Sequence, residues 1–136
     1  MPRTLMISLF LGMIGCAAAG SVQAKSDLIG SWTVEYIRER PVIDNSPAYI
    51  KFLEEDRVAG NSSCNQFTGT YNLRAGELEV SKLASTKKMC PPALMEQENR
   101  FLATLQRVKK FQIVQGLLVL LDENDETLFR ASQRPE

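Results

Sequence analysis

Apolar and polar residues alternate along much of the chain, which predicts several short antiparallel strands separated by turns. In the first of these strands, Trp32, Val34 and Tyr36 would share one face. The segment 117–121 is apolar on both faces, and we expect it to be covered on both sides. Strands are predicted over residues 29–37, 49–53, 58–60, 67–73, 77–81, 111–115, 117–121 and 127–131.

One segment follows a helical period instead. From residue 93 to residue 108, apolar side chains recur at spacings of three, four and seven. Pro91 and Pro92 precede this segment, and proline is tolerated in the first turn of a helix. About seven to eight strands around one helix favour a mainly β (α+β) fold. We expect a small antiparallel barrel or strongly curved sheet, with the helix packed against one opening.

The N-terminus has the features of an export signal. Arg3 precedes an apolar run over residues 5–14, which is too short to span a bilayer but suits a signal peptide. We predict that residues 1–24 form this signal and that residues 25–136 form a single periplasmic or secreted domain. The alternative is cleavage before Cys16, in a sequence similar to a lipoprotein box. Cys16 would then be lipidated, and the protein would be anchored to the membrane, facing the periplasm.

Export makes a disulfide the favoured interpretation of Cys64 and Cys90, because thiols oxidise outside the cytoplasm. Closing this loop of about 27 residues would stabilise the domain by roughly 3.5 kcal/mol in the chain-entropy model. Two buried free thiols are an alternative. A redox-active pair is disfavoured, because the close C-x-x-C spacing that tunes thiolate reactivity is absent.

Glu98 is the anomaly of the predicted helix, because its position falls on the apolar face. A buried carboxylate without hydrogen-bond donors is costly or stays protonated. We therefore expect Glu98 to accept hydrogen bonds from the polar loop 61–68, tying the helix to that loop. Two alternatives are a solvated carboxylate at the rim of the barrel and a catalytic acid or ligand anchor.

The composition excludes several kinds of chemistry. The chain has no histidine, which removes Ser-His and Cys-His nucleophile systems and most zinc or copper sites. No G-x-S-x-G elbow or phosphate-binding glycine loop is present. We therefore predict no catalytic residue, metal or cofactor. Without residues 1–24 the formal charge is −1, so nothing in the charge balance points to nucleic acid.

Three separated blocks of sequence carry a family resemblance. They are Gly60-x-x-x-Cys64-Asn65-x-Phe67-x-Gly69-x-Tyr71, Leu83-Ala84-Ser85-Thr86 with Met89-Cys90, and Glu98-x-x-Phe101-Leu102-x-x-Leu105. In this order they resemble the META domain of the heat-shock protein HslJ family, over about residues 28–131. The resemblance implies a bacterial envelope domain with a lipocalin-like antiparallel barrel and a helix, and a link to heat or antibiotic stress. It supplies no catalytic residue.

We therefore expect a non-enzymatic stress-response module that binds an unidentified envelope protein, peptide or small ligand. The membrane would be a partner only if Cys16 is lipidated. One alternative is a hydrolase-like enzyme using Glu98 and the hydroxyls of Ser62, Ser63, Thr68 and Thr86; another is a membrane-tethered structural lipoprotein. The residues expected to form a structural or ligand-binding site are Asn65, Thr68, Thr86 and Glu98.

Overall fold

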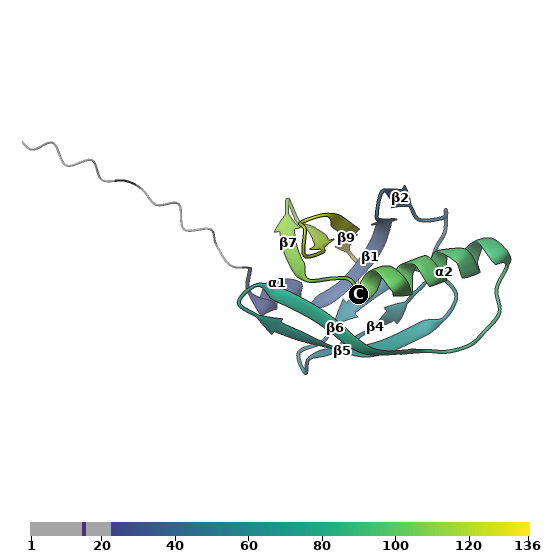
Figure 1. Ribbon diagram of the computed structural model, residues 1–136. Helices are drawn as coiled ribbons and strands as arrows, with labels where there is room; N and C mark the ends of the chain where they lie inside the picture. The colour runs from purple at the N-terminus through teal and green to yellow at the C-terminus, as the bar shows by residue number, and fades with distance from the viewer. Residues whose placement is uncertain (1–14, 16–22) are drawn as a thin grey trace, which may run out of the picture.

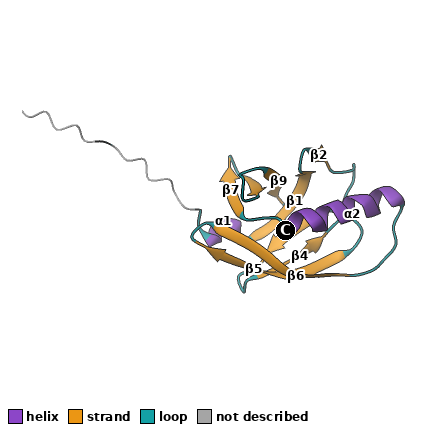
Figure 2. Cartoon of the chain, in the orientation of Figure 1, coloured by secondary structure: helices purple, strands orange, loops and turns teal. Residues whose placement is uncertain are grey.

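The computed structural model describes residue 15 and residues 23–136. In this part of the chain, nine antiparallel strands form a single sheet, accompanied by one short helix and one long helix (Figure 2). The helices are α1 (Lys25–Leu28) and α2 (Pro92–Leu105). The strands are β1 (Gly30–Ile37), β2 (Arg40–Pro41), β3 (Tyr49–Phe52), β4 (Arg57–Asn61), β5 (Gln66–Arg74), β6 (Glu77–Ser85), β7 (Lys110–Val114), β8 (Leu117–Leu121) and β9 (Thr127–Gln133).

The sheet closes into a ring. Strands β3 to β9 follow one another in sequence order, β3 pairs with β1, and β9 pairs back onto β1. The short strand β2 pairs with the last two residues of β1, Tyr36 and Ile37. The joint between β6 and β7 is the shortest in the ring, with the single residue pair Glu77 and Lys110. Helix α2 forms the connection across this joint.

Helix α2 lies against the curved sheet (Figure 1), and its side chains Phe101 and Leu105 belong to the buried core. The ring of Phe101 lies 5.4 Å from that of Phe67 on β5 and 5.2 Å from that of Phe129 on β9, measured between centroids. All three side chains are fully buried. One helical residue thus joins opposite parts of the sheet, and burying three aromatic rings is a large part of the core's stabilisation.

The predicted fold class is confirmed: the chain is mainly β, antiparallel and curved, with one long packed helix. Strand β2 and helix α1 were not expected. The helix was predicted over residues 93–108, but α2 ends at Leu105. The chain then turns through hydrogen bonds between residues three apart, from Arg107 N to Thr104 O and from Val108 N to Leu105 O.

Two expectations about side-chain direction were wrong. The pairing of β1 with β9 shifts between Val34 and Tyr36, and this bulge turns Ile37 inward in place of Tyr36. In β8, Leu118 and Leu120 are buried, but Leu117 is 37% exposed, so the outer face of the strand is not fully covered. Hydrophobic character on both faces therefore overestimated the burial of this strand.

The predicted apolar signal run and Cys16 lie outside the described residues, and the division into residues 1–24 and 25–136 stays a prediction. Among the residues that the structure describes, no helix has the length and apolar character needed to cross a bilayer.

Candidate functional site

Glu98 lies at the centre of a buried polar cluster between α2 and the loop that joins β4 to β5. Its side chain is 4% exposed. Oε1 accepts hydrogen bonds from Ser62 Oγ at 2.8 Å, Asn65 N at 2.6 Å and Cys64 N at 3.3 Å. Oε2 accepts one from Asn65 Nδ2 at 2.7 Å. We call Glu98 with Ser62, Cys64 and Asn65 the Glu98 hub.

The hub gives both oxygens of its carboxylate hydrogen-bond partners. Three donors converge on Oε1, and one donor reaches Oε2. Burial alone raises the pKa of Glu98. The hydrogen bonds from the Asn65 side chain and backbone, the Ser62 hydroxyl and the Cys64 amide oppose burial, and the net effect is a lowered pKa. Glu98 is therefore ionised at neutral pH and has no proton to donate as an acid.

Asn65 links the hub to the segment that leads into α2. Its Oδ1 accepts hydrogen bonds from Lys88 N at 2.7 Å and Thr86 Oγ1 at 2.9 Å, and its Nδ2 also donates to Lys88 O at 3.0 Å. The side-chain amide thus acts like a short strand partner for residues 86–88. Asn65 is buried, whereas Thr86 is exposed at the rim of the cluster.

The disulfide crosses the same region. Cys64 and Cys90 are joined, with their Cα atoms 6.1 Å apart, so the predicted pairing is present. Pro91 caps α2 directly after Cys90 and accepts the first helical hydrogen bonds, from Leu94 N and Met95 N. The bridge therefore fastens the polar loop covalently to the residue just before the N-cap of α2, and the hub fastens the same loop to α2 itself by hydrogen bonds.

Gln97 is a second buried polar residue of this helix, and the sequence analysis missed its role. Its Nε2 donates to Ser63 Oγ at 3.1 Å and to Ser46 Oγ at 2.9 Å, and its Oε1 accepts from Ile43 N at 2.8 Å. Ser63 has a φ of 141°, a conformation that is rare for residues other than glycine. Gln97 therefore helps to hold a strained loop residue in place; its position next to Glu98 was the available signal.

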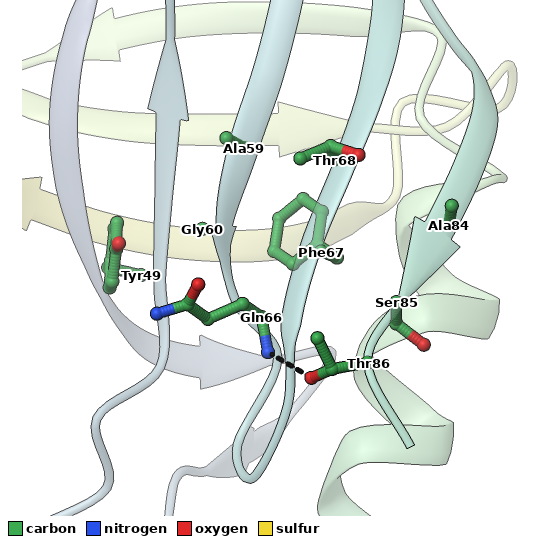
Figure 3. Close-up of a pocket in the computed structure, with 9 residues that line it drawn as sticks. All are labelled: Tyr49, Ala59, Gly60, Gln66, Phe67, Thr68, Ala84, Ser85 and Thr86. Carbon is green, nitrogen blue, oxygen red and sulfur yellow. Dashed lines mark hydrogen bonds between the residues drawn. The ribbon is translucent and has the colours of Figure 1, made fainter. Parts of the chain in front are cut away.

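Of the four predicted site residues, the structure brings together Asn65, Thr86 and Glu98, but not Thr68. Thr68 points outward from β5, paired with Ala59 on one side and Ala84 on the other. These small side chains line a shallow hollow of about 310 Å³ on the outer face of the sheet (Figure 3). Thr86 lies at its edge and accepts a hydrogen bond from Gln66 N at 3.2 Å, drawn as a dashed line in Figure 3.

The hydroxyls considered for an enzyme are engaged elsewhere or isolated. Ser62 donates to Glu98, Ser63 accepts from Gln97, and Thr86 donates to Asn65. The two serines are no more than 2% exposed, so a substrate cannot reach them without opening the loop. Within residues 23–136, no group of three or more acidic or thiol side chains is arranged to hold a metal ion.

Trp32 belongs to the hydrophobic core. Its side chain is 2% exposed, and its Nε1 donates to Leu28 O at 2.9 Å, which leaves no ring face open for a ligand. This hydrogen bond also fixes α1 against β1.

The fold and the hub define a class of protein: a small ring of antiparallel strands whose one long helix is fastened to a polar loop by a disulfide and a buried carboxylate. The model of the META domain family matches residues 26–135. Heat shock protein HslJ of Escherichia coli (strain K12) is 32% identical over 131 residues, covering 93% of this chain and 87% of that protein. The chain therefore belongs to the META domain family.

Two solved structures share the fold. A protein from Burkholderia xenovorans, determined by NMR, matches over the whole of both chains with a TM-score of 0.69 and 17% identity. A DUF4847 family protein from Bacteroides vulgatus ATCC 8482 matches with a TM-score of 0.60 and 13% identity, covering 81% of this chain and 96% of that one. At these identities the likeness concerns the fold alone.

Proposed function

We propose that this chain is a non-enzymatic module of the bacterial cell envelope that supports tolerance of heat or antibiotic stress by binding a small ligand, peptide or protein. The observation that carries the non-enzymatic part is the burial of Glu98 among internal donors. This carboxylate is only 4% exposed, and it accepts four hydrogen bonds from the chain itself. A general acid or base must come within hydrogen-bond reach of the substrate proton that it transfers.

The envelope location is supported by the disulfide and by the predicted export signal. Structural disulfides persist in oxidising compartments and are rare in the cytoplasm. The link to stress is supported by the family and by the name of the 32% identical relative, a heat shock protein. We extend that association from the relative to this chain.

The test is survival of the host bacterium after deletion of the gene. We expect the deletion to lower survival at raised temperature or under antibiotic exposure, and plasmid-borne wild-type chain to restore it. A version lacking residues 1–24 stays in the cytoplasm and should fail to restore survival. Unchanged survival of the deletion strain under every stress would remove the proposed role.

Glu98→Gln separates a binding module from an enzyme in the same assay. If Glu98 is structural, this variant should restore survival whenever its folded fraction, measured in cell extract by protease resistance, equals that of the wild type. Loss of rescue by a variant that is equally folded would instead favour the hydrolase-like alternative.

The intact mass of the purified mature chain distinguishes the two predicted cleavage sites, because it differs between a Lys25 N-terminus and an acylated Cys16.

A further inference from the structure

Four arginines surround a cleft that is separate from the Glu98 hub. Arg38 follows the end of β1, Arg40 lies on β2, Arg100 on α2 and Arg130 on β9. The cleft has a volume of about 880 Å³, within the range of small-molecule sites. Its lining also includes the carboxylates of Glu39 and Glu126, so the arginines exceed the acidic groups by two. We call it the arginine cleft.

Arg100 is the most buried of the four arginines. Its side chain is 16% exposed, and its Nε is fully buried without a hydrogen-bond partner. Burial lowers the pKa of Arg100, the neighbouring Arg40 lowers it further, and Glu96 partly offsets both. The guanidinium remains charged, since arginine does not deprotonate in proteins. A buried charge with a spare donor is costly unless an anion compensates it.

Among the described residues, Glu96 is the only carboxylate within salt-bridge distance of Arg40 and Arg100, and it reaches both through a single oxygen. Glu96 Oε1 lies 3.3 Å from Arg40 Nη1 and 3.5 Å from Arg100 Nη1, and the Glu96 side chain is 65% exposed. These distances are long for charge-assisted hydrogen bonds, which lie near 2.7–2.9 Å. Glu96 is not among the residues that line the cleft, so this weak, exposed contact leaves both guanidinium groups able to bind an oxyanion from the side of the cleft.

The other two arginines of the cleft are Arg38 and Arg130. The guanidinium of Arg130 lies 4.0 Å from the centre of the Tyr36 ring, within the range of a cation–π contact. Arg38 has a φ of 57°, and its backbone N donates to Leu128 O at 2.7 Å. No salt bridge among the described residues involves Arg38 or Arg130.

We propose that the arginine cleft binds a small organic anion through a phosphate or carboxylate group, which Arg40 and Arg100 hold between their guanidinium groups in place of the contact with Glu96. Arg38 and Arg130 line the remaining volume and contact a second polar or anionic part of the ligand. Arg is suited to this role because its planar fork matches phosphate and carboxylate oxygens. The inference gives a ligand class to the proposed binding module and rests on that function only for its biological meaning.

Titration with inorganic phosphate, acetate and chloride at constant ionic strength tests the site on the mature chain. The arginine Nε–Hε signals in NMR report each guanidinium separately. We expect saturable shifts for Arg40 and Arg100 with phosphate or acetate but not with chloride. The anion that binds more tightly shows whether the site prefers a phosphate or a carboxylate group. Arg57 and Arg74 lie outside the cleft and serve as internal controls. Equal shifts at the control arginines, or no saturation, would overturn the proposal.

Three variants sharpen the result. Arg100→Lys removes the fork and should weaken binding about tenfold, the equivalent of one charge-assisted hydrogen bond. Glu96→Gln removes the competing carboxylate and should tighten binding by about threefold or more. Arg57→Lys should leave binding unchanged. If Arg100→Lys does not fold, Arg40→Lys replaces it, because that side chain is 62% exposed and is not needed for packing.

Unchanged affinity in Arg40→Lys and Arg100→Lys would show that phosphate binds elsewhere, whatever the stress assay reports. Failure of the deletion strain to lose stress tolerance would remove the proposed function while leaving the measured affinity intact. The two failures are therefore distinguishable.

Discussion

The Glu98 hub and the arginine cleft use charges of opposite sign in opposite ways, although both depend on α2. Glu98 and Arg100 are two residues apart on the helix, so they project from different sides of it. The hub gives its carboxylate four donors from the chain itself. In the cleft, Arg40 and Arg100 share one oxygen of an exposed glutamate. A buried charge that the chain itself supplies with several hydrogen-bond partners indicates a structural role. Arginine N–H groups that lack such partners indicate a place for a ligand.

Removing the disulfide should have the largest effect on stability. The double variant Cys64→Ala/Cys90→Ala frees a loop whose ends are 26 residues apart. We expect the free energy of unfolding to fall by about 3.5 kcal/mol, chiefly because the unfolded chain gains freedom. Urea unfolding followed by fluorescence of Trp32, the only tryptophan, measures it. The reduced wild type should lose the same free energy of unfolding as the double variant. If the unfolded protein, never exposed to reductant, reacted with a thiol reagent at two sites, the disulfide would be contradicted.

Replacing Glu98 by Gln should be the next largest change, at about 2–3 kcal/mol of destabilisation. An amide cannot accept from all four donors, so at least one buried N–H or O–H loses its partner in either orientation of the new side chain. The matched control is Glu96→Gln, on the same helix but exposed, which should change stability by no more than about 0.5 kcal/mol. Similar losses in the two variants would mean that Glu98 is solvated and the hub is not structural.

The pH dependence of this difference follows from the lowered pKa of Glu98. Its folded-state pKa lies below the ordinary value of 4.5, so the unfolded chain takes up the proton first as the pH falls. The stabilisation is therefore fully present above pH 4.5 and is lost as the pH falls through the folded-state pKa. We expect the stability gap between wild type and Glu98→Gln to be constant near neutral pH and to narrow below pH 4.5. A gap that widened in acid would require a raised pKa.

A pair of threonines tests which of the predicted site residues support the Glu98 hub through a hydrogen bond. Thr86→Val removes the donor to Asn65 Oδ1 and the acceptor for Gln66 N, and should cost about 1 kcal/mol. Thr68→Val alters an exposed side chain that makes no hydrogen bond to the described residues, and should change stability by less than about 0.5 kcal/mol. Thermal unfolding of both variants side by side measures the contrast. Equal costs would place Thr68 within the cluster after all.

The sequence was sufficient for the hub because its residues break local rules. A glutamate on the apolar face of a helix needs donors, and a loop of Ser, Cys and Asn can supply them. The disulfide followed from the expected compartment. Strand directions were less predictable: the bulge in β1 that turns Ile37 inward depends on the pairing with β9, which is distant in sequence.

The arginine cleft could not be predicted, because no local rule is broken by any one of its residues. Arg38, Arg40, Arg100 and Arg130 each occupy a position where a charged residue is ordinary, and the closure of β9 onto β1 brings Arg130 to the other three. Basic residues that are adjacent in sequence do not form a comparable site: Lys109 and Lys110 contact Glu79 and Asp125.

Arg100→Met should change stability as little as the exposed control variants do, and this result would distinguish Arg100 from Glu98 directly. Methionine has a similar length and fills the space of the arginine stem, while it removes a buried charge whose Nε has no partner. We therefore expect the free energy of unfolding to stay within about 0.5 kcal/mol of the wild type, as for the exposed control Arg57→Met. Phosphate binding should nevertheless be lost in Arg100→Met and kept in Arg57→Met. A destabilisation of more than about 2 kcal/mol would instead make Arg100, like Glu98, a structural charge.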